Sequence, residues 1–309
     1  MKKVFIDGKA GTTGLRIFER LSNRPDIQIL SLSDDDRKDA AKRKEMINSS
    51  DITFLCLPDA AARESVSLVE NPDTIILDAS TAHRTEPDWA YGFPELSPEH
   101  LHRVQTGKRI AVPGCHASGF VALVQPLIAR GLLAPEVRLT CHSITGYSGG
   151  GKAMIAEYEA EDRSKLYDAP RQYALGQQHK HLKEMVKITG LAGAPIFCPI
   201  VSDYYSGMCV TVPVFREDLQ NAGIEDVRNV YRALYTGPIV RYSDCINENG
   251  LISANALSFN DTMQITVEGN EDRILLIARF DNLGKGASGA ALQCMNIAMG
   301  VDQTTGLAV

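Results

Sequence analysis

The chain has 309 residues, of which 44% are hydrophobic and 23% are charged, as is usual for a globular protein of one or two domains. A net charge of −6 provides no basic field for nucleic acid, and no apolar stretch approaches the roughly 18 residues of a membrane span. Seven cysteines without a C-x-x-C pair argue against a disulfide framework or a zinc site. We therefore expect a reduced, cytoplasmic protein with no metal centre, and neither nucleic acid nor a membrane as partner.

Short apolar strands alternate with helices in the first third of the chain. The expected strands are Val4–Asp7, Ile27–Ser33, Asp51–Leu57, Thr74–Ser80 and Arg109–Val112, and the expected helices are Thr12–Leu21, Ala40–Ile47 and Asp59–Val69. The spacing of Leu15, Phe18 and Leu21 predicts the apolar face of the first helix. This alternation predicts parallel strands joined by right-handed crossovers, which is a doubly wound, Rossmann-like α/β domain.

A glycine-rich turn joins the first strand to the first helix. Gly8, Gly11 and Gly14 are spaced G-x-x-G-x-x-G, with Thr12 and Thr13 between the last two. Glycines permit a tight turn and let the backbone approach a pyrophosphate closely. Because the turn follows a strand and precedes a helix, we expect these five residues to bind a dinucleotide.

The residues after the second strand bear on which nicotinamide cofactor binds. Asp34, Asp35 and Asp36 could accept a hydrogen bond from a ribose 2′-hydroxyl, as NAD requires. Ser33 with the nearby Arg37 could instead hold the 2′-phosphate of NADP. The residues alone leave both cofactors open, and the aspartates are equally typical of a solvated turn.

Cys115 is the strongest candidate nucleophile. It follows the fifth strand through Pro113 and Gly114 and opens an apolar helix that we expect over Gly119–Arg130. A helix N-terminus favours the thiolate, which is the nucleophilic form of cysteine. Together with a nicotinamide cofactor, such a cysteine indicates hydride transfer to an acyl thioester.

Several polar residues are candidate partners of that cysteine. His179 and His181 could act as acid or base, and the residues alone leave open which of them does so. Arg84 follows the fourth strand and could hold a carboxylate or a phosphate. Ser148 and Gly149 belong to a glycine-rich stretch that we expect to be a loop able to approach a phosphate.

After Arg130 the pattern predicts a second, α+β domain with a mixed or antiparallel sheet. Its expected elements are strands at Val137–Thr145 and Met208–Val214, a helix at Asn221–Tyr235, a hairpin of Met263–Glu268 with Arg273–Asp281, and a loop at Tyr167–Gln178. The last segment, Gly284–Met299, predicts a helix that packs back on the first domain. We therefore expect one domain over 1–114 plus 285–309 and a second over 115–284.

Seven segments together resemble the N-acetyl-γ-glutamyl-phosphate reductases of arginine biosynthesis, in their shorter form. These segments are Phe5–Leu15, Ser80–Arg84, Tyr91–Leu96, Pro113–Cys115, Tyr147–Gly151, His179–His181 and Asp281–Gly289. Two elements within these segments are the most specific for this family: Tyr-Gly-x-Pro-Glu-Leu and Lys-Gly-Ala-Ser-Gly. The same fold serves the related aspartate-semialdehyde dehydrogenases.

This resemblance implies roles for individual residues. It implies Cys115 as nucleophile, His179 as catalytic acid or base, and Asn282 close to the nicotinamide. It implies substrate binding by Arg84, His181 and Glu184, with Ser148 and Gly149, and it implies NADP as the cofactor, held by Gly8, Gly11, Thr12, Thr13, Gly14, Ser33, Arg37 and Pro58. His116 departs from the family, in which tyrosine often follows the nucleophile. Because neighbours at a helix start diverge in direction, His116 receives less weight as a partner of Cys115.

The expected reaction is the NADPH-dependent reductive dephosphorylation of N-acetyl-γ-glutamyl phosphate to the 5-semialdehyde, through a cysteine thioacyl intermediate. The partners would then be the acyl phosphate, the semialdehyde and inorganic phosphate, and we expect a homo-oligomer, either a dimer or a tetramer. An aspartate-semialdehyde dehydrogenase and a catalytically silent, dinucleotide-sensing regulator stay open as alternatives. A cysteine hydrolase is a third alternative, although the glycine turn speaks against it.

Overall fold

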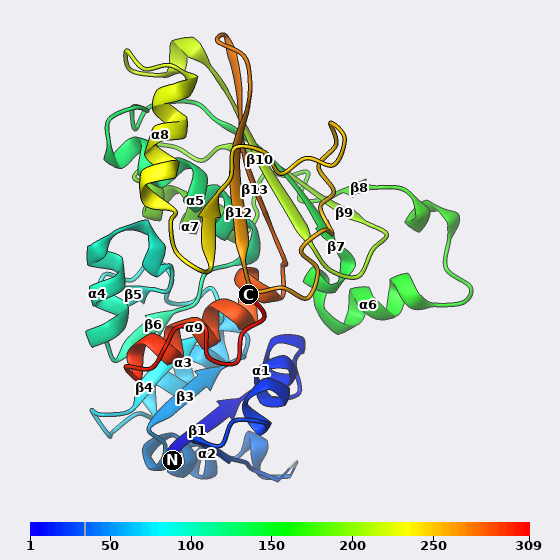
Figure 1. Ribbon diagram of the computed structural model, residues 1–309. Coiled ribbons are helices and arrows are strands. Elements are labelled where there is room, and N and C mark those ends of the chain that lie inside the picture. The colour runs from blue at the N-terminus through cyan, green and yellow to red at the C-terminus, as the bar shows by residue number, and fades with distance from the viewer. Residues whose placement is uncertain (34) are drawn as a thin grey trace. The chain divides into compact units, whose positions relative to one another are not determined.

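The computed structural model describes residues 1–33 and 35–309, so that Asp34 of the aspartate run lies outside the described residues. Contacts divide the chain into two compact units (Figure 1). Unit 1 comprises Met1–Pro94, Pro98–Pro113 and Ala287–Leu307, and unit 2 comprises Glu95–Ser97, Gly114–Gly286 and Ala308–Val309.

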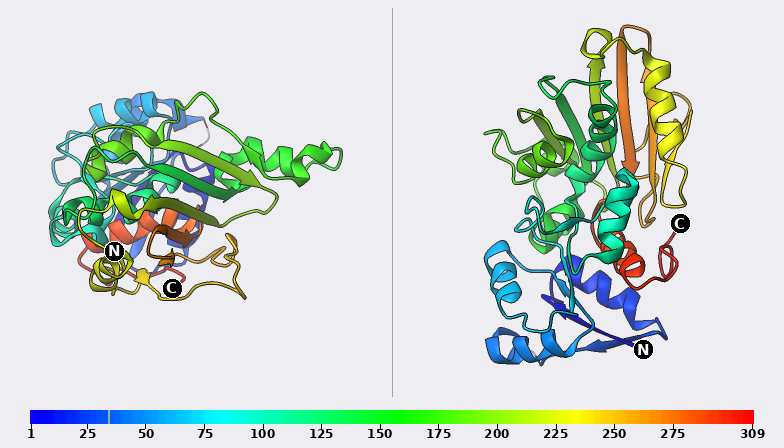
Figure 2. Two further views of the ribbon diagram at one scale, coloured as in Figure 1. Left: turned by 90° about the horizontal axis from the view of Figure 1, so that it is seen from above. Right: turned by 90° about the vertical axis from the view of Figure 1, so that its left-hand side faces the viewer.

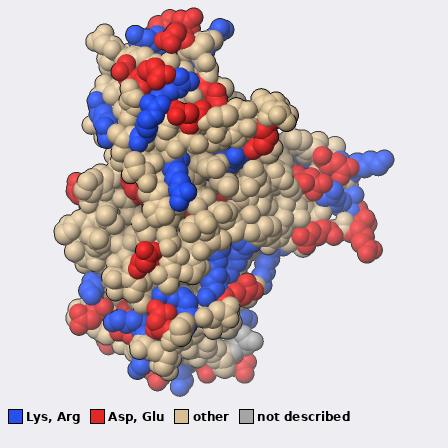
Figure 3. Space-filling view, in the orientation of Figure 1, with Lys and Arg blue, Asp and Glu red and all other residues tan. Residues whose placement is uncertain are grey.

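On the face shown in Figure 3, Lys and Arg side chains lie among Asp and Glu side chains, so the charge there is mixed in sign.

The described part of unit 1 forms a parallel sheet of six strands in the order β2-β1-β3-β4-β6-β5. The strands are β1 (Lys2–Asp7), β2 (Ile27–Leu30), β3 (Ile52–Leu55), β4 (Ile75–Asp78), β5 (Ala90–Tyr91) and β6 (Arg109–Ala111). The helices are α1 (Thr12–Ser22), α2 (Ala40–Ser49), α3 (Asp59–Ser67), α4 (Pro98–Thr106) and α9 (Gly289–Ala298). The predicted doubly wound α/β fold is confirmed.

Two apolar clusters cover the two faces of this sheet. Val4 and Ile6 of β1 pack with side chains of α1, α4 and α9, whereas Phe5 between them packs with side chains of α2 and α3. This is the period of two expected of a strand that is buried on both faces. The right-hand view of Figure 2 shows the strands of unit 1 between their helices.

Unit 2 contains, among its described residues, a seven-stranded mixed sheet in the order β11-β12-β13-β10-β7-β9-β8. The strands are β7 (Thr140–Gly146), β8 (Arg171–Gln172), β9 (Ile196–Ser202), β10 (Met208–Phe215), β11 (Val240–Tyr242), β12 (Met263–Gly269) and β13 (Arg273–Phe280). Its helices are α5 (Cys115–Ala129), α6 (Gly151–Glu159), α7 (His181–Thr189) and α8 (Ile224–Leu234). The β7–β9 and β11–β12 pairs are parallel and the others antiparallel, which confirms the mixed sheet.

Helix α5 is the central helix of unit 2 and packs against β10, β13, α7 and α8. It begins at Cys115, four residues before the predicted start at Gly119, because Gly114 is extended and serves as the N-cap. Inside the helix, a Cβ on Gly119 would lie 2.5 Å from Val210 Cγ2, so α5 and β10 approach each other too closely for a side chain there.

Three local expectations are corrected. The glycine-rich stretch that contains Ser148 and Gly149 is not a loop: a 3₁₀ turn at Tyr147–Gly150 leads into α6, which Figure 2 shows projecting from the rest of unit 2. The terminal helix begins at Gly289, after a π-helical turn over Gly284–Ser288. In α1, Ile17 and Leu21 are buried, whereas Leu15 is 40% exposed and lines a pocket described below.

None of the described helices is both long and apolar enough to cross a membrane.

Candidate active site

The three glycines of the turn in unit 1 are glycines for different reasons. Gly8 has φ of +89°, and a Cβ there would lie 2.3 Å from the carbonyl oxygen of Cys56. A Cβ on Gly14 would lie 2.6 Å from the carbonyl oxygen of Gly8. Gly11 has only ordinary contacts, the nearest at 3.5 Å. The fold therefore requires Gly8 and Gly14, whereas the missing side chain of Gly11 leaves space at the N-terminus of α1, where anions bind.

A cavity of about 640 Å³ in unit 1 extends from this turn to the end of β2. Gly8, Gly11 and Leu15 line it near the turn, and Arg37 and Lys38 line it beyond β2. A smaller cavity of about 170 Å³ is lined by Gly11, Thr13, Gly14, Cys56, Leu57 and Ala79. A nucleotide with a phosphate near the two cations would suit these surroundings.

The remaining candidates for cofactor binding in unit 1 lie outside the residues that line the two cavities. Thr12 is the first residue of α1, and Pro58 is the N-cap of α3. Ser33 Oγ donates to Asp36 Oδ2 at 2.9 Å. Lys38 follows Arg37 in the chain and also lines the larger cavity, but it was not predicted as a site residue. Burial raises the pKa of the Cys56 thiol to about 12, so that it stays protonated beside the turn.

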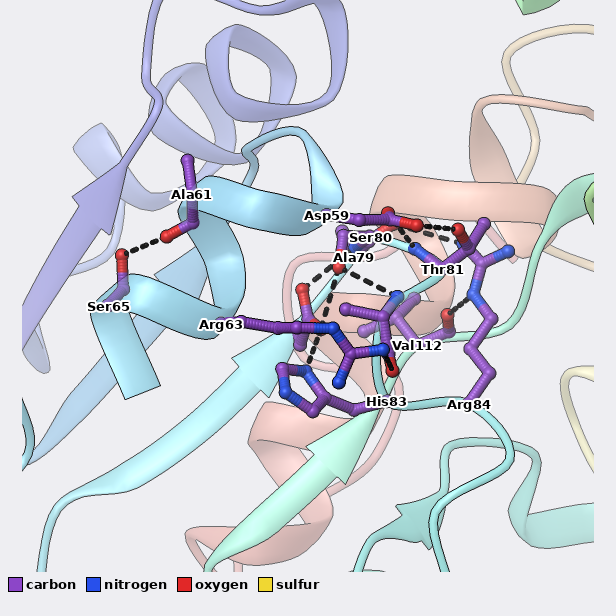
Figure 4. Close-up of polar contacts among 12 residues, drawn as sticks. Asp59, Ala61, Arg63, Ser65, Ala79, Ser80, Thr81, His83, Arg84 and Val112 are labelled. Atoms are coloured by element: carbon purple, nitrogen blue, oxygen red, sulfur yellow. Dashed lines mark hydrogen bonds and ion pairs between the residues drawn. The ribbon is translucent and has the colours of Figure 1, made fainter. Parts of the chain in front are cut away.

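The segment that carries Arg84 is fixed by Asp78, a buried aspartate at the end of β4. Figure 4 labels Ser80, His83 and Arg84 of this segment. Asp78 accepts hydrogen bonds from the Ser80 backbone N–H at 2.9 Å and the Ser80 hydroxyl at 2.8 Å. His83 Nδ1 lies 2.6 Å from the same carboxylate, and its ring stacks on Trp89 at 4.1 Å. Asp78 thus fixes the turn that precedes Arg84.

Arg84 is itself buried at the carboxyl edge of the parallel sheet. Its Nε donates to the Val112 carbonyl at 2.8 Å and its Nη2 to the Ala79 carbonyl at 3.0 Å. These bonds join the segments that follow β4 and β6 (Figure 4). The guanidinium therefore has a defined position at the edge where open α/β sheets bind ligands.

In unit 2, Cys115 is the first residue of α5 and is partly exposed. The backbone N–H of Gly114 donates to Glu184 Oε1 of α7 at 2.9 Å. Glu184 is 2% exposed, so this carboxylate fixes the start of α5 from inside the protein. It was predicted as a substrate-binding residue, and its contact with Gly114 was not foreseen.

The segment after β13 approaches Cys115 closely. A Cβ on Gly286 would lie 3.0 Å from the Cys115 Cβ and 3.1 Å from the carbonyl oxygen of Asp281. The neighbouring Lys285 is buried and pairs with the carboxylate of Glu95. Lys285 and Glu95 each belong to one of the two sequence elements that are most specific for the resemblance, and they pair within unit 2.

Asn282 and Ser148 lie together in unit 2. The side-chain amide of Asn282 donates from Nδ2 to Ser148 Oγ at 3.0 Å and accepts at Oδ1 from the Gly207 N–H at 2.9 Å. A Cβ on Gly149 would lie 3.4 Å from Asn282 Nδ2. The structure therefore brings Asn282 together with Ser148 and Gly207, which are far from it and from each other in the sequence.

Three histidines of unit 2 surround the start of α5. The ring of His116 lies 5.6 Å from that of His179 and 5.7 Å from that of His181, and the latter two are 4.7 Å apart. The His181 backbone N–H donates to His179 Nδ1 at 3.2 Å, so in neutral His179 the proton is on Nε2. Burial, and then the charge of Lys180, lower the pKa of His179 to about 4.

His116 is the member of this cluster that we ranked below His179 and His181 as a partner of Cys115. Its Nδ1 lies 2.6 Å from Ser143 Oγ and its Nε2 lies 2.6 Å from the Tyr173 hydroxyl. Burial, followed by the charges of His179 and Lys180, lowers the pKa of His116 to about 3. At the start of α5 the side chain of His116 contacts Ser143 of β7, a contact that no spacing in the sequence indicates. Over residues 1–33 and 35–309, no group of His, Cys, Asp and Glu side chains is arranged to hold a metal ion.

A Rossmann-like unit and a mixed-sheet unit with a cysteine at a helix start define an oxidoreductase of the semialdehyde dehydrogenase class. Residues 3–104 match the family described as semialdehyde dehydrogenase, NAD binding domain, and residues 115–282 match semialdehyde dehydrogenase, dimerisation domain. The chain belongs to this family, in the group of the N-acetyl-γ-glutamyl-phosphate reductases.

Individual relatives of the chain support its assignment to this group. The chain is 42% identical to N-acetyl-gamma-glutamyl-phosphate reductase 2 of Nostoc sp., with 99% of each chain covered. It is 41% identical to the reductase of Rhizobium meliloti, over 96% of this chain and 98% of the relative.

Solved structures share the fold at low sequence identity. Aspartate semialdehyde dehydrogenase II of Vibrio cholerae is 15% identical with a TM-score of 0.70, over 97% of this chain and 98% of that one. The Candida albicans enzyme, solved with NADP, is 16% identical with a TM-score of 0.63, over 97% and 98%.

Proposed function

We propose that this protein reduces N-acetyl-γ-glutamyl phosphate to N-acetylglutamate 5-semialdehyde with NADPH and releases inorganic phosphate, a step of arginine biosynthesis. The observation that carries the proposal is the position of Cys115 as the first residue of α5, directly before His116, whose ring lies 5.6 Å from that of His179 and 5.7 Å from that of His181. The reductase names of relatives that cover nearly the whole chain support the choice of substrate.

Unit 1, including the returning α9, would be the NADP-binding domain, and unit 2 the catalytic and dimerisation domain. The space at Gly11 and the α1 N-terminus suit the pyrophosphate, with Thr12 and Thr13 supplying N–H groups. Arg37, with Ser33 and the neighbouring Lys38, would hold the 2′-phosphate, because guanidinium and ammonium groups pair with phosphate. We also assign Gly8, Gly14, Pro58 and Asn282 to the surroundings of the cofactor.

The Cys115 thiolate would attack the acyl carbon of the substrate. The new C–S bond replaces the C–O bond to phosphate, so that inorganic phosphate leaves and a thioester on Cys115 remains. N–H groups at the start of α5 favour the thiolate and can stabilise negative charge on the acyl oxygen. Glu184 supports this step by holding the Gly114 N–H, which fixes the position of Cys115.

NADPH, when bound, supplies the hydride that the thioester carbon accepts. Negative charge then moves to the acyl oxygen, and the Nε2–H of His179 would donate a hydrogen bond to it. The His181 amide supports this role, because it occupies Nδ1 and leaves the proton on Nε2. When the C=O bond re-forms, the C–S bond breaks, the semialdehyde leaves and Cys115 is again a thiolate.

Substrate binding would involve the two ends of the acyl phosphate. Arg84 is assigned to the phosphoryl group, supported by its buried position at the carboxyl edge of the sheet of unit 1. His181, Ser148 and Gly149 are assigned to the remainder of the substrate.

The reverse reaction tests the proposal. Purified protein should reduce NADP when given N-acetylglutamate semialdehyde and inorganic phosphate, with little activity on aspartate semialdehyde and with NADP preferred to NAD. Cys115→Ser should lose this activity and keep NADP binding. Equal turnover by Cys115→Ser, or a preference for aspartate semialdehyde, would contradict the proposal. NADP binding without any phosphate-dependent reduction would favour a silent regulator instead.

A further inference from the structure

The chain leaves the sheet of unit 2 shortly after the edge strand β8. β8 pairs with β9 in antiparallel register, and the Tyr173 N–H extends this pairing to the Pro199 carbonyl at 3.0 Å. A turn follows, in which Ala174 and Gln177 have φ of 54° and 53° and the Gln177 N–H donates to the Ala174 carbonyl at 3.0 Å. The backbone of this turn no longer pairs with β9 as a strand, so another group must hold it to the sheet.

The side chain of Gln177 makes that attachment. Its Nε2 donates to the Phe197 carbonyl of β9 at 2.8 Å, and its Oε1 accepts from the Phe197 N–H at 2.8 Å. Two residues of an antiparallel pair exchange the same two hydrogen bonds, so the side-chain amide takes the place of a peptide group of the missing strand. Because both bonds end on one residue, they fix the turn in position and in angle.

The residue held by Gln177 also contacts the ring of His179, two positions further along the chain. The His179 and Phe197 rings lie 5.2 Å apart, edge to face, and His116 and Tyr173 contact the same imidazole at 5.6 and 6.1 Å. The His181 N–H occupies Nδ1. Within residues 1–33 and 35–309, Nε2 of His179 makes no hydrogen bond, so the ring is oriented on its sides while this nitrogen stays available.

We propose that Gln177 is a positioning residue for the acid–base group His179. By pairing with both backbone groups of Phe197, it fixes the turn so that the imidazole enters its ring contacts with Nδ1 toward the His181 amide and Nε2 free for the substrate. This inference rests on the proposed function, which assigns His179 to the acyl oxygen. Both bonds of the Gln177 amide are to backbone, so Gln177 would act on the reaction only through His179.

Kinetics of the reverse reaction test the proposal, and the neighbouring glutamine provides a matched control. Gln177→Ala should lower kcat about 10- to 100-fold, since a misplacement of about 1 Å costs about 100-fold, and should leave NADP affinity unchanged. Gln177→Glu keeps the acceptor for the Phe197 N–H and loses the donor, so its kcat should lie between those of the wild type and Gln177→Ala. Gln178→Ala, at an exposed position, should keep the wild-type kcat.

A double variant shows whether Gln177 acts through His179. His179→Asn alone should lower kcat by about 100- to 10,000-fold, as is typical for loss of an acid–base group. The variant that combines Gln177→Ala with His179→Asn should then turn over as slowly as His179→Asn alone, because there is no imidazole left to position. Losses that multiply in the double variant would overturn the inference, because they would show that Gln177 affects turnover without His179.

The chemical reactivity of His179 tests the attachment without substrate or cofactor. The full-length protein is treated at neutral pH with diethyl pyrocarbonate, which modifies neutral imidazole, and His179 is followed by peptide mass spectrometry. One net hydrogen bond changes a local opening equilibrium by about 5-fold, so the loss of both in Gln177→Ala should speed the modification by about 25-fold. Gln178→Ala should react at the wild-type rate. Equal rates in Gln177→Ala and the wild type would overturn the inference.

The outcomes distinguish this inference from the proposed function. Activity that His179→Asn abolishes and Gln177→Ala leaves at the wild-type level would overturn the inference and leave the proposed function intact. Wild-type turnover in His179→Asn would contradict the role that the proposed function gives to His179, and the inference with it. Thermal unfolding shows whether each variant is folded, and the nearly isosteric Gln177→Glu keeps the proposal testable if Gln177→Ala is not.

Discussion

Lys285 Nζ lies 3.0 and 2.9 Å from the two carboxylate oxygens of Glu95, 190 positions earlier in the chain. The lysine side chain is 1% exposed and that of the glutamate 14%. Breaking a buried pair by removing one partner leaves the other charge without compensation. Because Gly286 follows Lys285 and approaches Cys115, this ion pair also fixes the backbone beside the nucleophile.

Removal of either charge should therefore destabilise the protein. We expect Lys285→Met or Glu95→Gln to lower the free energy of unfolding by about 3–5 kcal/mol, as measured by urea denaturation. The double variant should lose less than the sum of the single losses, since neither charge is then left alone. Losses that simply add would show that the two residues do not interact.

A methyl group at position 286 should impair catalysis more than stability. In Gly286→Ala the new Cβ would lie 3.0 Å from the Cys115 Cβ and 3.3 Å from Phe280 Cε2, so Cys115 must shift. We expect kcat to fall about 10-fold, because a misplacement of reacting groups by about 1 Å costs about 100-fold and this shift is smaller, and we expect NADP affinity to stay unchanged. Gly176→Ala, which meets nothing within 4 Å, is the control. Normal turnover in Gly286→Ala would mean that this contact does not position the nucleophile.

The glycine turn offers a matched pair of variants. Gly11→Ala should keep the melting temperature of the wild type and weaken NADP binding, because the added methyl group enters the space left for the pyrophosphate. Gly14→Ala should lower the melting temperature, because its Cβ would lie 2.6 Å from the Gly8 carbonyl oxygen. Fluorescence titration with NADP and thermal unfolding measure the two effects. Unchanged NADP affinity in Gly11→Ala would place the pyrophosphate elsewhere.

Two histidines, His116 which is buried and His179 which is half-buried, make stability fall in acid. The pKa of His116 is lowered from 6.5 to about 3, and that of His179 to about 4, chiefly by burial. The unfolded chain therefore takes up protons below about pH 6.5, whereas the folded chain does not until near pH 4 and 3. The stabilisation is complete above pH 6.5 and is lost as the pH falls through this window.

His116 alone should cost about 2 kcal/mol of stability between pH 7.5 and pH 5. His116→Gln has no titrating group at that position, so its loss over this range should be smaller by that amount. Urea denaturation of both proteins at the two pH values measures the difference. An identical loss in the two proteins would mean that His116 is charged in the folded state.

The fold was largely predictable because its signals are local. Strands buried on both faces are continuous apolar runs, and Gly8 and Gly14 are required by close contacts within one turn. Short elements such as β5 lack a periodic pattern, and α6 begins among glycines that predict a loop. These elements depend on tertiary contacts that the sequence does not display.

Site residues were predictable only where the local sequence around a single residue indicates its role. Cys115 follows from its position between a strand and a helix. Other contacts of the site join residues that are distant in the sequence: the ion pair of Lys285 with Glu95, the hydrogen bond from Gly114 to Glu184, and the contact of His116 with Ser143. No spacing encodes such contacts, because each depends on how the helices and strands pack.

The most direct test of the account is a search for the thioacyl enzyme. The protein is mixed with N-acetyl-γ-glutamyl phosphate in the absence of NADPH, quenched in acid and analysed by intact-mass and peptide mass spectrometry. We predict one equivalent of released phosphate and one N-acetylglutamyl group on Cys115, which disappears when NADPH is added before the quench. Phosphate release without an acyl group on Cys115, or an unmodified Cys115 during full turnover, would contradict the central claim.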